Sequence, residues 1–345
     1  MIRLIEPQYS KSRLDRAGES FRNNTQSEED TRILENWRAA HAYIINTFQA
    51  NLRNRARLSN ALVGQRLKRK PTILDKLKRF PKMQLSRMHD IAGCRVVFDS
   101  VDELLEFREQ ISQSRAKHKR ITATRDQFNY IKDPKSSGYR GIHDVYKYRA
   151  MTESGSKWDN LLIEIQYRTR VQHAWATAVE TADLLTRSRG KFSEANAEYE
   201  EFFRICSEIL ARYHEEMNSC LPNINEKQLI MRLYEIEHNQ KILRLLKNTN
   251  KISPNKFSGA IDRGKNVVLI YPFLRDKTSK FILQVNSFST AHDAIKCYEE
   301  KEKQWKDAAD VVLVMSKDVN TLMKVFQNYF TDTKDFIKYI ERATS

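Results

Sequence analysis

The chain of 345 residues is 40% hydrophobic and 30% charged, which is typical of a folded globular protein of about two domains and excludes a fibrous or fully disordered chain. Its net charge of +16 favours polyanionic partners such as nucleotides, nucleic acid or a membrane surface, unless it only serves solubility. No apolar run approaches the ~20 residues of a membrane span, the N-terminus lacks a signal-peptide core, and the four cysteines show neither zinc-ligand spacing nor a disulfide framework, so we expect a cytoplasmic protein that does not enter a membrane.

The N-terminal half is predicted to combine helices with three strands. Residues 1–30 are polar and predict an arm with a short helix. Between Glu29 and Leu58, apolar residues recur every three or four positions, which predicts a long amphipathic helix. A second amphipathic helix is predicted at residues 101–114. Strands are predicted at residues 94–100, 142–150 and 161–169, the last two as a hairpin across a turn that contains Gly and Ser.

Long helices dominate the next part of the chain, at residues 171–187, at residues 195–217 and, after a break at residues 219–225, to about Lys247. A polar segment with Gly and Pro at residues 248–266 then predicts a linker. The remainder alternates strands and helices and predicts a small α/β unit. We therefore predict an α+β fold, with a mixed β-sheet flanked by helices and a smaller C-terminal α/β domain. The predicted boundaries are 1–30 for the arm, 31–220 for the main domain, 221–262 for a helix and linker, and 263–345 for the small domain.

The stretch LLIEIQYRT at residues 161–169 alternates apolar and polar side chains. Because a strand sends successive side chains to opposite faces, Ile163, Ile165 and Tyr167 belong on one face. Glu164, Gln166 and Arg168 belong on the other face, where they need a polar partner.

A basic segment precedes these strands. Twelve Lys or Arg residues and one acidic residue, Asp75, lie between Arg53 and His89. Arg66 and Lys68 stand before Pro71, and Lys76 and Lys78 follow it. Arg offers a planar fork of donors and Lys a compact charge, so a cluster on both sides of a turn suits the phosphates of a nucleotide. The alternative is an ordinary solvated face.

Two acids have unusual positions. Asp90 stands just before a predicted strand that begins near Arg95, and Glu164 lies on the polar face of another. Each acid also has a purely structural explanation. Asp90 can be a turn or cap residue, and Glu164 can be an ion-pair partner of Arg168. Together they suit Mg²⁺, which takes one or two carboxylates beside substrate phosphates. The pair His89–Asp90 also occurs in metal-dependent phosphohydrolases, but further His ligands at helical spacing are absent from the sequence.

A glycine-flanked tyrosine follows in the loop DPKSSGYRG at residues 133–141. Tyr139 can lie flat on a nucleotide base, or it can pack on the sheet edge. His143 and Lys147 share one face of the next strand and point either toward phosphates or, for His143, into the core.

Several motifs resemble the RelA/SpoT nucleotide pyrophosphokinase domain, in the order RLKRKPTILDK, DIAGCRVV, IKDPKSSGYRGIHDVY and IEIQYRT. The resemblance covers roughly residues 30–190 and includes the lead-in of compact, single-gene members. It implies a nucleotidyltransferase-like synthetase fold. Family members transfer the β,γ-pyrophosphate of ATP, with Mg²⁺, to a ribose 3′-hydroxyl. The usual acceptor is GDP or GTP, giving guanosine tetra- or pentaphosphate alarmones, whereas some toxic members modify the 3′-terminal adenosine of tRNA.

The resemblance also implies roles for individual residues. Asp90 matches the Mg²⁺-binding aspartate, and Glu164 matches the second acid, which assists the metal or the attacking hydroxyl. Tyr139 matches the tyrosine that stacks on the acceptor base. Thr72 stands where Ser is usual, and Gly141 stands where Ser is frequent. ATP and its phosphates are expected at Arg66, Lys68, Thr72, Lys76, Lys78 and Arg95. The acceptor is expected at Lys135, Tyr139, Arg140, His143, Gln166 and Arg168.

Three hypotheses follow for the function. The protein is an alarmone synthetase, a toxin-like tRNA pyrophosphokinase, or a catalytically inactive nucleotide- or RNA-binding regulator on the same fold. The positive charge favours tRNA, but it is spread along the whole chain. For the C-terminal unit, the alternatives are packing and homo-oligomer formation, or control of the synthetase as a fused antitoxin or phage-defence sensor that responds to a protein trigger.

Overall fold

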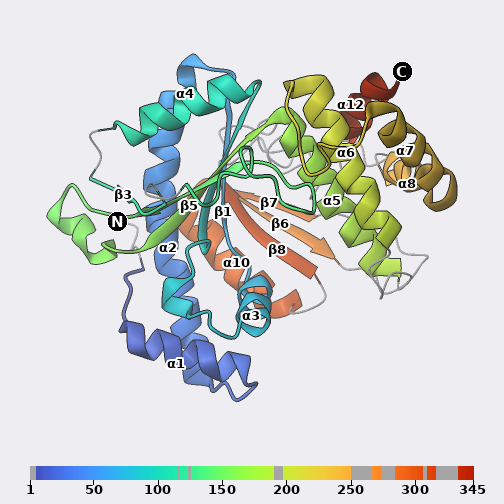
Figure 1. Ribbon diagram of the computed structural model, residues 1–345. Helices are drawn as coiled ribbons and strands as arrows, with labels where there is room; N and C mark the ends of the chain where they lie inside the picture. Colours follow the sequence, from blue (N-terminus) through green and yellow to red (C-terminus); the bar gives the residue numbers. More distant parts are fainter. Residues whose placement is uncertain are drawn as a thin grey trace.

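One mixed β-sheet joins the two ends of the chain. The computed structural model describes residues 5–114, 117–122, 126–189, 197–249, 266–272, 284–305, 309–315 and 333–345. Over these residues the sheet has eight strands in the order β3-β4-β5-β2-β1-β8-β6-β7, with helices packed around it (Figure 1). The strands are β1 (Leu62–Leu67), β2 (Ala92–Phe98), β3 (Lys119–Arg120), β4 (Ile142–Lys147), β5 (Leu162–Thr169), β6 (Asn266–Pro272), β7 (Gln284–Phe288) and β8 (Ala309–Met315).

The helices carry the same labels as in Figure 1. They are α1 (Lys11–Arg22), α2 (Glu28–Arg55), α3 (Lys70–Arg79), α4 (Val101–Ser112), α5 (Arg170–Arg189), α6 (Ala197–Glu215), α7 (Glu226–Gln240), α8 (Ile242–Thr249), α10 (Ala291–Trp305) and α12 (Lys334–Thr344). This mixed α+β architecture confirms the predicted fold class. Among the described residues, none of the helices combines the length and the apolar character that crossing a membrane requires.

Local sequence explains the long helix α2. Ser27 and Asp30 form a capping box, in which each side chain bonds the backbone N–H of the other residue. The apolar stripe that predicted the helix is buried and includes Ile33, Ile44 and Phe48. Helix α1 packs on α2 through buried residues of its own, so this part of the predicted N-terminal arm is a packed helix.

Two elements inside the basic segment depart from the prediction. The sequence suggested a turn at Pro71, but β1 ends at Leu67 and α3 begins at Lys70. Pro71 lies in the first turn of α3, where the ring fits because the first N–H groups of a helix have no partner within it. Lys68 therefore follows a strand, whereas Thr72 and Lys76 lie one turn apart on a helix.

The strand register brings the polar side chains onto one face. Strand β2 runs parallel to β5 with Gly93 opposite Glu164 and Arg95 opposite Gln166. Strand β4 forms the predicted antiparallel hairpin with β5 and sets His143 opposite Gln166. Since directly paired residues point to the same side, these side chains share one face of the sheet. The other face carries Ile163, Ile165 and Tyr167, which are fully buried, as the alternation in β5 predicted.

The C-terminal strands continue this sheet. Strand β8 pairs antiparallel with β1, through Arg66 opposite Val314, and β6 and β7 follow outward. Helix α12 packs into the group formed by α5, α6, α7 and α8, where Phe336 and Ile340 are buried (Figure 1). The strands and helices predicted after residue 262 are present where the structure describes them. Residues 250–265, which contain most of the predicted linker, lie outside the described residues, as do residues 316–332 in the predicted α/β unit.

Candidate active site

A shallow pocket lies over the polar face, where β1, β2 and β5 run side by side. Its lining combines two carboxylates with a set of cationic and polar side chains. The lining residues are Gly64, Gln65, Arg66, Lys68, Asp90, Gly93, Cys94, Arg95, Glu164 and Gln166. Asp90 and Glu164 are 74 positions apart in the sequence, yet the parallel pairing of β2 with β5 brings them to the same pocket. The convergence predicted from the sequence is therefore present.

Asp90 holds two lysines at one oxygen. The ammonium groups of Lys68 and Lys76 both lie 2.8 Å from Asp90 Oδ2. Burial alone would raise the pKa of Asp90, but the charges of the two lysines outweigh burial and lower it. Burial lowers the pKa of Lys68, and the Asp90 carboxylate opposes that effect. The cluster is a compact centre in which one carboxylate faces two ammonium groups.

Glu164 lies at the centre of a second cluster. Its Oε1 is 3.2 Å from His143 Nδ1 and 3.6 Å from His89 Nε2, and its Oε2 accepts a hydrogen bond of 2.7 Å from Gln166. Burial alone would raise the pKa of Glu164, but the charge and hydrogen bond of His143 outweigh burial and hold the pKa far below its usual range. Glu164 is therefore a firmly ionised carboxylate and a weak proton acceptor in this arrangement.

Tyr139 continues this cluster through its hydroxyl. The Tyr139 oxygen lies 2.6 Å from His143 Nε2 and accepts a hydrogen bond of 2.9 Å from Arg168. Burial would raise the pKa of Tyr139, but Arg168 and His143 outweigh burial and lower it to about 8. Burial likewise would lower the pKa of His143, but Tyr139 and Glu164 raise it to about 9. Glu164, His143 and Tyr139 thus form a continuous hydrogen-bonded chain.

The ring of Tyr139 is surrounded by cationic and aromatic groups. Arg168 Cζ lies 5.1 Å and Lys135 Nζ 5.2 Å from the ring centroid, and Tyr130 meets the ring edge-on at 5.7 Å. Trp175 is buried in the neighbouring helical group, with its ring 6.4 Å from the ring of Tyr139. Tyr139 is half-buried, so the aromatic surface that remains open is bordered by positive charge.

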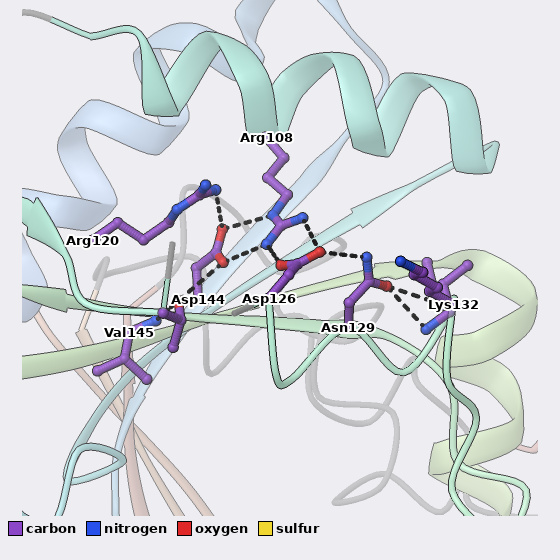
Figure 2. Close-up of polar contacts among 9 residues, drawn as sticks. Arg108, Arg120, Asp126, Asn129, Lys132, Asp144 and Val145 are labelled. Atoms are coloured by element: carbon purple, nitrogen blue, oxygen red, sulfur yellow. Dashed lines mark hydrogen bonds and ion pairs between the residues drawn. The ribbon is translucent and has the colours of Figure 1, made fainter. Parts of the chain in front are cut away.

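A buried ion-pair network supports the loop that carries Tyr130. On the face of β4 opposite His143, Asp144 binds Arg108 of α4 through two hydrogen bonds of 2.9 Å and 2.8 Å. Arg108 also pairs with Asp126, whose carboxylate accepts a hydrogen bond from Asn129 (Figure 2). The Asn129 side chain accepts in turn from the backbone N–H of Lys132. The network fixes residues 126–132 against the sheet.

Arg95 adds a buried cation beside the pocket. It lies on β2 next to Glu164's strand, and burial together with the charge of Arg168 lowers its pKa to about 9. Arg66 lies on β1, opposite Gly93. A Cβ at Gly93 would meet only the Arg66 carbonyl, at 3.7 Å, so the pocket floor is open at this position. An anion that enters here would relieve the repulsion between these guanidinium groups.

Two of the predicted site residues lie outside this cluster. Arg140 is buried and pairs with Glu215 of α6, which also accepts from Thr169 and Gln172. Lys78 is exposed on the far side of α3 and binds the Asn24 side chain at 2.8 Å. Among the other predicted residues, Thr72 lies one turn before Lys76 on α3, and Lys135 is exposed above the tyrosine rings.

Sequence reasoning missed two residues of the site. His89 packs its ring on Phe128 at 5.8 Å and faces Glu164, and both Glu164 and Asp90 act on its charge, so it lies between the Asp90 and Glu164 clusters. We considered it only as part of a phosphohydrolase motif. Tyr130 meets both Tyr139 and His143 edge-on. In the sequence, the one indication of a role for Tyr130 is that it is an aromatic residue shortly before the loop at residues 133–141.

The donor set fits a magnesium ion that is shared with a phosphorylated substrate. Asp90 Oδ1 is buried and has no hydrogen-bond partner among the described residues, so it retains lone pairs for a cation. Both oxygens of Glu164 already accept hydrogen bonds. Within the part of the chain that the structure describes, three or more His, Cys, Asp or Glu residues do not gather into a self-sufficient metal site. Mg²⁺ commonly binds one or two carboxylates and completes its coordination shell with substrate phosphates and water. Among these carboxylates, Asp90 is the one best placed to hold it.

Comparisons with known proteins agree with the motifs. The family model described as "Region found in RelA / SpoT proteins" matches residues 65–185. The GTP pyrophosphokinase YjbM of Bacillus subtilis is 33% identical over 170 residues, which cover 48% of this chain and 74% of that protein. An uncharacterized protein of Mycobacterium tuberculosis is 28% identical over 175 residues, which cover 50% of this chain and 59% of its own length.

A solved structure is similar over about half of the chain. The small alarmone synthetase 1 from Bacillus subtilis is 26% identical, with a TM-score of 0.43, and the match covers 51% of this chain and 89% of that chain. The matched family segment contains Arg66, Asp90 and Glu164, which line the pocket, and Tyr139, which bonds the neighbouring His143. The chain therefore belongs to the RelA/SpoT family.

Proposed function

We propose that this protein is an ATP-dependent pyrophosphokinase that transfers the β,γ-pyrophosphate of ATP to the ribose 3′-hydroxyl of GDP or GTP. The observation that carries the proposal is the pocket in which Asp90 and Glu164 meet Arg66, Lys68 and Arg95. The relative from Bacillus subtilis supports the reaction, because it is named a GTP pyrophosphokinase. A cytoplasmic location stays a prediction.

The Asp90 cluster suits the pyrophosphate donor. Lys68 and Lys76 place two ammonium groups on one carboxylate oxygen, and a triphosphate offers oxygens that can take over these donors. Magnesium, when bound at Asp90, would neutralise charge on the phosphate oxygens. Arg66 and Arg95 add guanidinium donors on neighbouring strands. The donor side thus stabilises the negative charge that develops as the pyrophosphoryl group is transferred.

The Tyr139 cluster suits the acceptor nucleotide. The partly exposed Tyr139 ring offers a stacking surface for a base, and Lys135 and Arg168, which lie over the ring, offer positive charge for the acceptor's phosphates. Glu164, held in place by His143 and Gln166, is in position to orient the attacking hydroxyl. Its low pKa means that it orients the hydroxyl more effectively than it removes a proton in the substrate-free arrangement. Holding the hydroxyl in line with the β-phosphorus lowers the activation free energy of transfer by a large amount.

A labelling experiment tests the acceptor. The protein is incubated with ATP labelled at the γ-phosphate, Mg²⁺ and, in parallel, GDP, GTP or deacylated tRNA. We expect label in guanosine tetra- or pentaphosphate. Label in tRNA alone would replace the guanine nucleotide by the toxin-like alternative, and the absence of label from every acceptor would favour the inactive regulator.

A matched pair of variants assigns the transfer to this site. Asp90→Asn removes the charge that holds Lys68 and Lys76, so we expect transfer to fall by about 100-fold or more. Asp75→Asn is the control, because Asp75 is an exposed residue of α3 whose carboxylate pairs with Arg79 on the same helix. Undiminished transfer by Asp90→Asn would show that the reaction takes place elsewhere.

A further inference from the structure

A carboxylate from the C-terminal part of the chain contacts the segment that joins β1 to α3. Glu302 of α10 accepts a hydrogen bond of 2.8 Å from Arg38 Nη1 and one of 2.6 Å from the Tyr298 hydroxyl. Its Oε1 also lies 3.4 Å from the backbone nitrogen of Lys70. The Glu302 side chain is only 17% exposed, so these contacts form in a largely desolvated place.

Arg38 connects Glu302 to the residues that hold Asp90. Its guanidinium lies over the Tyr298 ring at 4.6 Å, and its Nε donates a hydrogen bond of 2.7 Å to the carbonyl of Lys68. The side chain of Lys68 then binds Asp90. Arg38 is buried, and a buried guanidinium is stabilised by a negatively charged partner such as the Glu302 carboxylate. A continuous series of short contacts therefore leads from α10 to Asp90.

The second connection passes through the first turn of α3. Arg69, the residue that precedes this helix, makes no side-chain capping bond to it. The first N–H groups of a helix have no partner within the helix, and its N-terminus is the positive end of the helix dipole. Glu302 places a carboxylate at this end, against the N–H of Lys70. Helix α3 carries Lys76, the other lysine that binds Asp90.

We propose that Glu302 is a positioning residue for the ATP side of the active site. It fixes Lys68 through Arg38 and fixes α3, with Lys76, through the backbone of Lys70. The C-terminal region then completes the donor site instead of covering it, so its loss lowers activity. The part of the proposal that concerns ATP rests on the proposed function, whereas the connection to residues 68–74 does not.

Hydrogen–deuterium exchange tests the connection without substrate. We expect Glu302→Ala to raise amide exchange in residues 68–74 by about tenfold or more relative to the wild type, because the Lys70 N–H and the Arg38 guanidinium both lose the Glu302 carboxylate. Glu300→Ala is the matched control, since Glu300 is exposed on the same helix two residues away. Glu302→Gln keeps the shape and one acceptor oxygen, and we expect a smaller increase from it. If Glu302→Ala does not fold, this variant decides the test. Unchanged exchange in residues 68–74 would overturn the proposal.

Binding measurements test the consequence for the site. We expect Glu302→Ala to weaken binding of a non-hydrolysable ATP analogue by about tenfold and to leave binding of GDP unchanged, because Tyr139 and His143 bond each other, Arg168 and Glu164, whereas Glu302 bonds Arg38, Tyr298 and the backbone of Lys70. Glu300→Ala should bind both as the wild type does. Equal loss for both nucleotides would indicate general destabilisation and contradict a positioning role. A wild-type protein that binds neither nucleotide would overturn the proposed function, and the exchange result would still decide the connection.

Discussion

Lys76 Nζ lies 2.8 Å from Asp90 Oδ2, the same oxygen that accepts Lys68. The two lysines come from different elements, Lys68 from the end of β1 and Lys76 from the second turn of α3. One carboxylate oxygen cannot neutralise two ammonium groups, so the cluster keeps a positive charge for an anionic ligand. The geometry explains why a basic segment interrupted by Pro71 forms a site instead of a solvated face.

Lys76 and Lys78 give a matched comparison on one helix. We expect Lys76→Met to raise the KM for ATP and to lower the rate of transfer by about 100-fold, because it removes a donor from the Asp90 cluster. Lys78→Met should leave both within about twofold, since Lys78 is exposed and binds Asn24. Steady-state kinetics at varied ATP concentration measures both effects. Equal losses in the two variants would mean that the positive charge of α3 acts as a whole.

The proton affinity of His143 provides a test of the second cluster. Its pKa is raised from 6.5 to about 9, so the protonated ring stabilises the fold, fully below pH 6.5 and no longer once the pH has risen through about 9. Tyr139 and Glu164 both raise this pKa, so Glu164→Gln, which removes the carboxylate and keeps Tyr139, should bring the pKa of His143 below about 9. NMR titration of the imidazole measures the change. His118, which stacks on Tyr148 at 5.0 Å, is the internal control and should not change. An unaltered His143 pKa would contradict the coupling.

Arg140 is expected to act through stability and not through the acceptor. Its guanidinium is buried against Glu215, and loss of one partner of a buried ion pair costs about 3–5 kcal/mol. We therefore expect Arg140→Met to lower the free energy of unfolding by this amount while the KM for GDP of the folded protein is unchanged. Denaturant unfolding and kinetics on the same samples separate the two quantities.

Lys135→Met is the counterpart of that variant. Lys135 is exposed, and its ammonium group lies 4.3 Å from the Tyr130 centroid and 5.2 Å from that of Tyr139. We expect it to raise the KM for GDP severalfold and to change the free energy of unfolding by less than about 1 kcal/mol. If Arg140→Met raised the KM for GDP and Lys135→Met did not, Arg140 would bind the acceptor, as the sequence analysis predicts.

Regular patterns explain what could be predicted from the sequence. The alternation in β5 placed Glu164 and Gln166 on the polar face, and helical periodicity located α2 and α6, because one buried face imposes its period on the chain. Strand β1 escaped prediction since Gly64 and Arg66 interrupt its apolar pattern. It is a strand because β2 and β8 pair with it on both sides.

Pairings between distant residues explain what could not be predicted. Arg140 and Glu215 are separated by 75 positions, and nothing in either local sequence indicates the other. The same holds for β8, whose apolar run predicted a strand but not the edge on which it pairs. His89 became a site residue only because the sheet brings Glu164 to it. Contacts between elements far apart in the chain decided these features, and neither local sequence indicates which distant segment it meets.

Gly141 stands where Ser is frequent in the family, and the structure predicts how a Ser here would change the stability of the protein. Its φ is +146°, and an added Cβ would lie 3.2 Å from Arg168 Cγ and from the Tyr167 carbonyl, and 3.4 Å from the Tyr139 hydroxyl. We expect Gly141→Ser to destabilise the protein by about 1–3 kcal/mol, through backbone strain and crowding at Tyr139. Gly93→Ala is the control for stability, because its Cβ would make only an ordinary contact of 3.7 Å with the Arg66 carbonyl. We expect it to be neutral or slightly stabilising while it weakens ATP binding by filling the pocket floor. Denaturant unfolding of both variants checks the contrast, and a Gly141→Ser protein as stable as the wild type would show that the loop moves aside without cost.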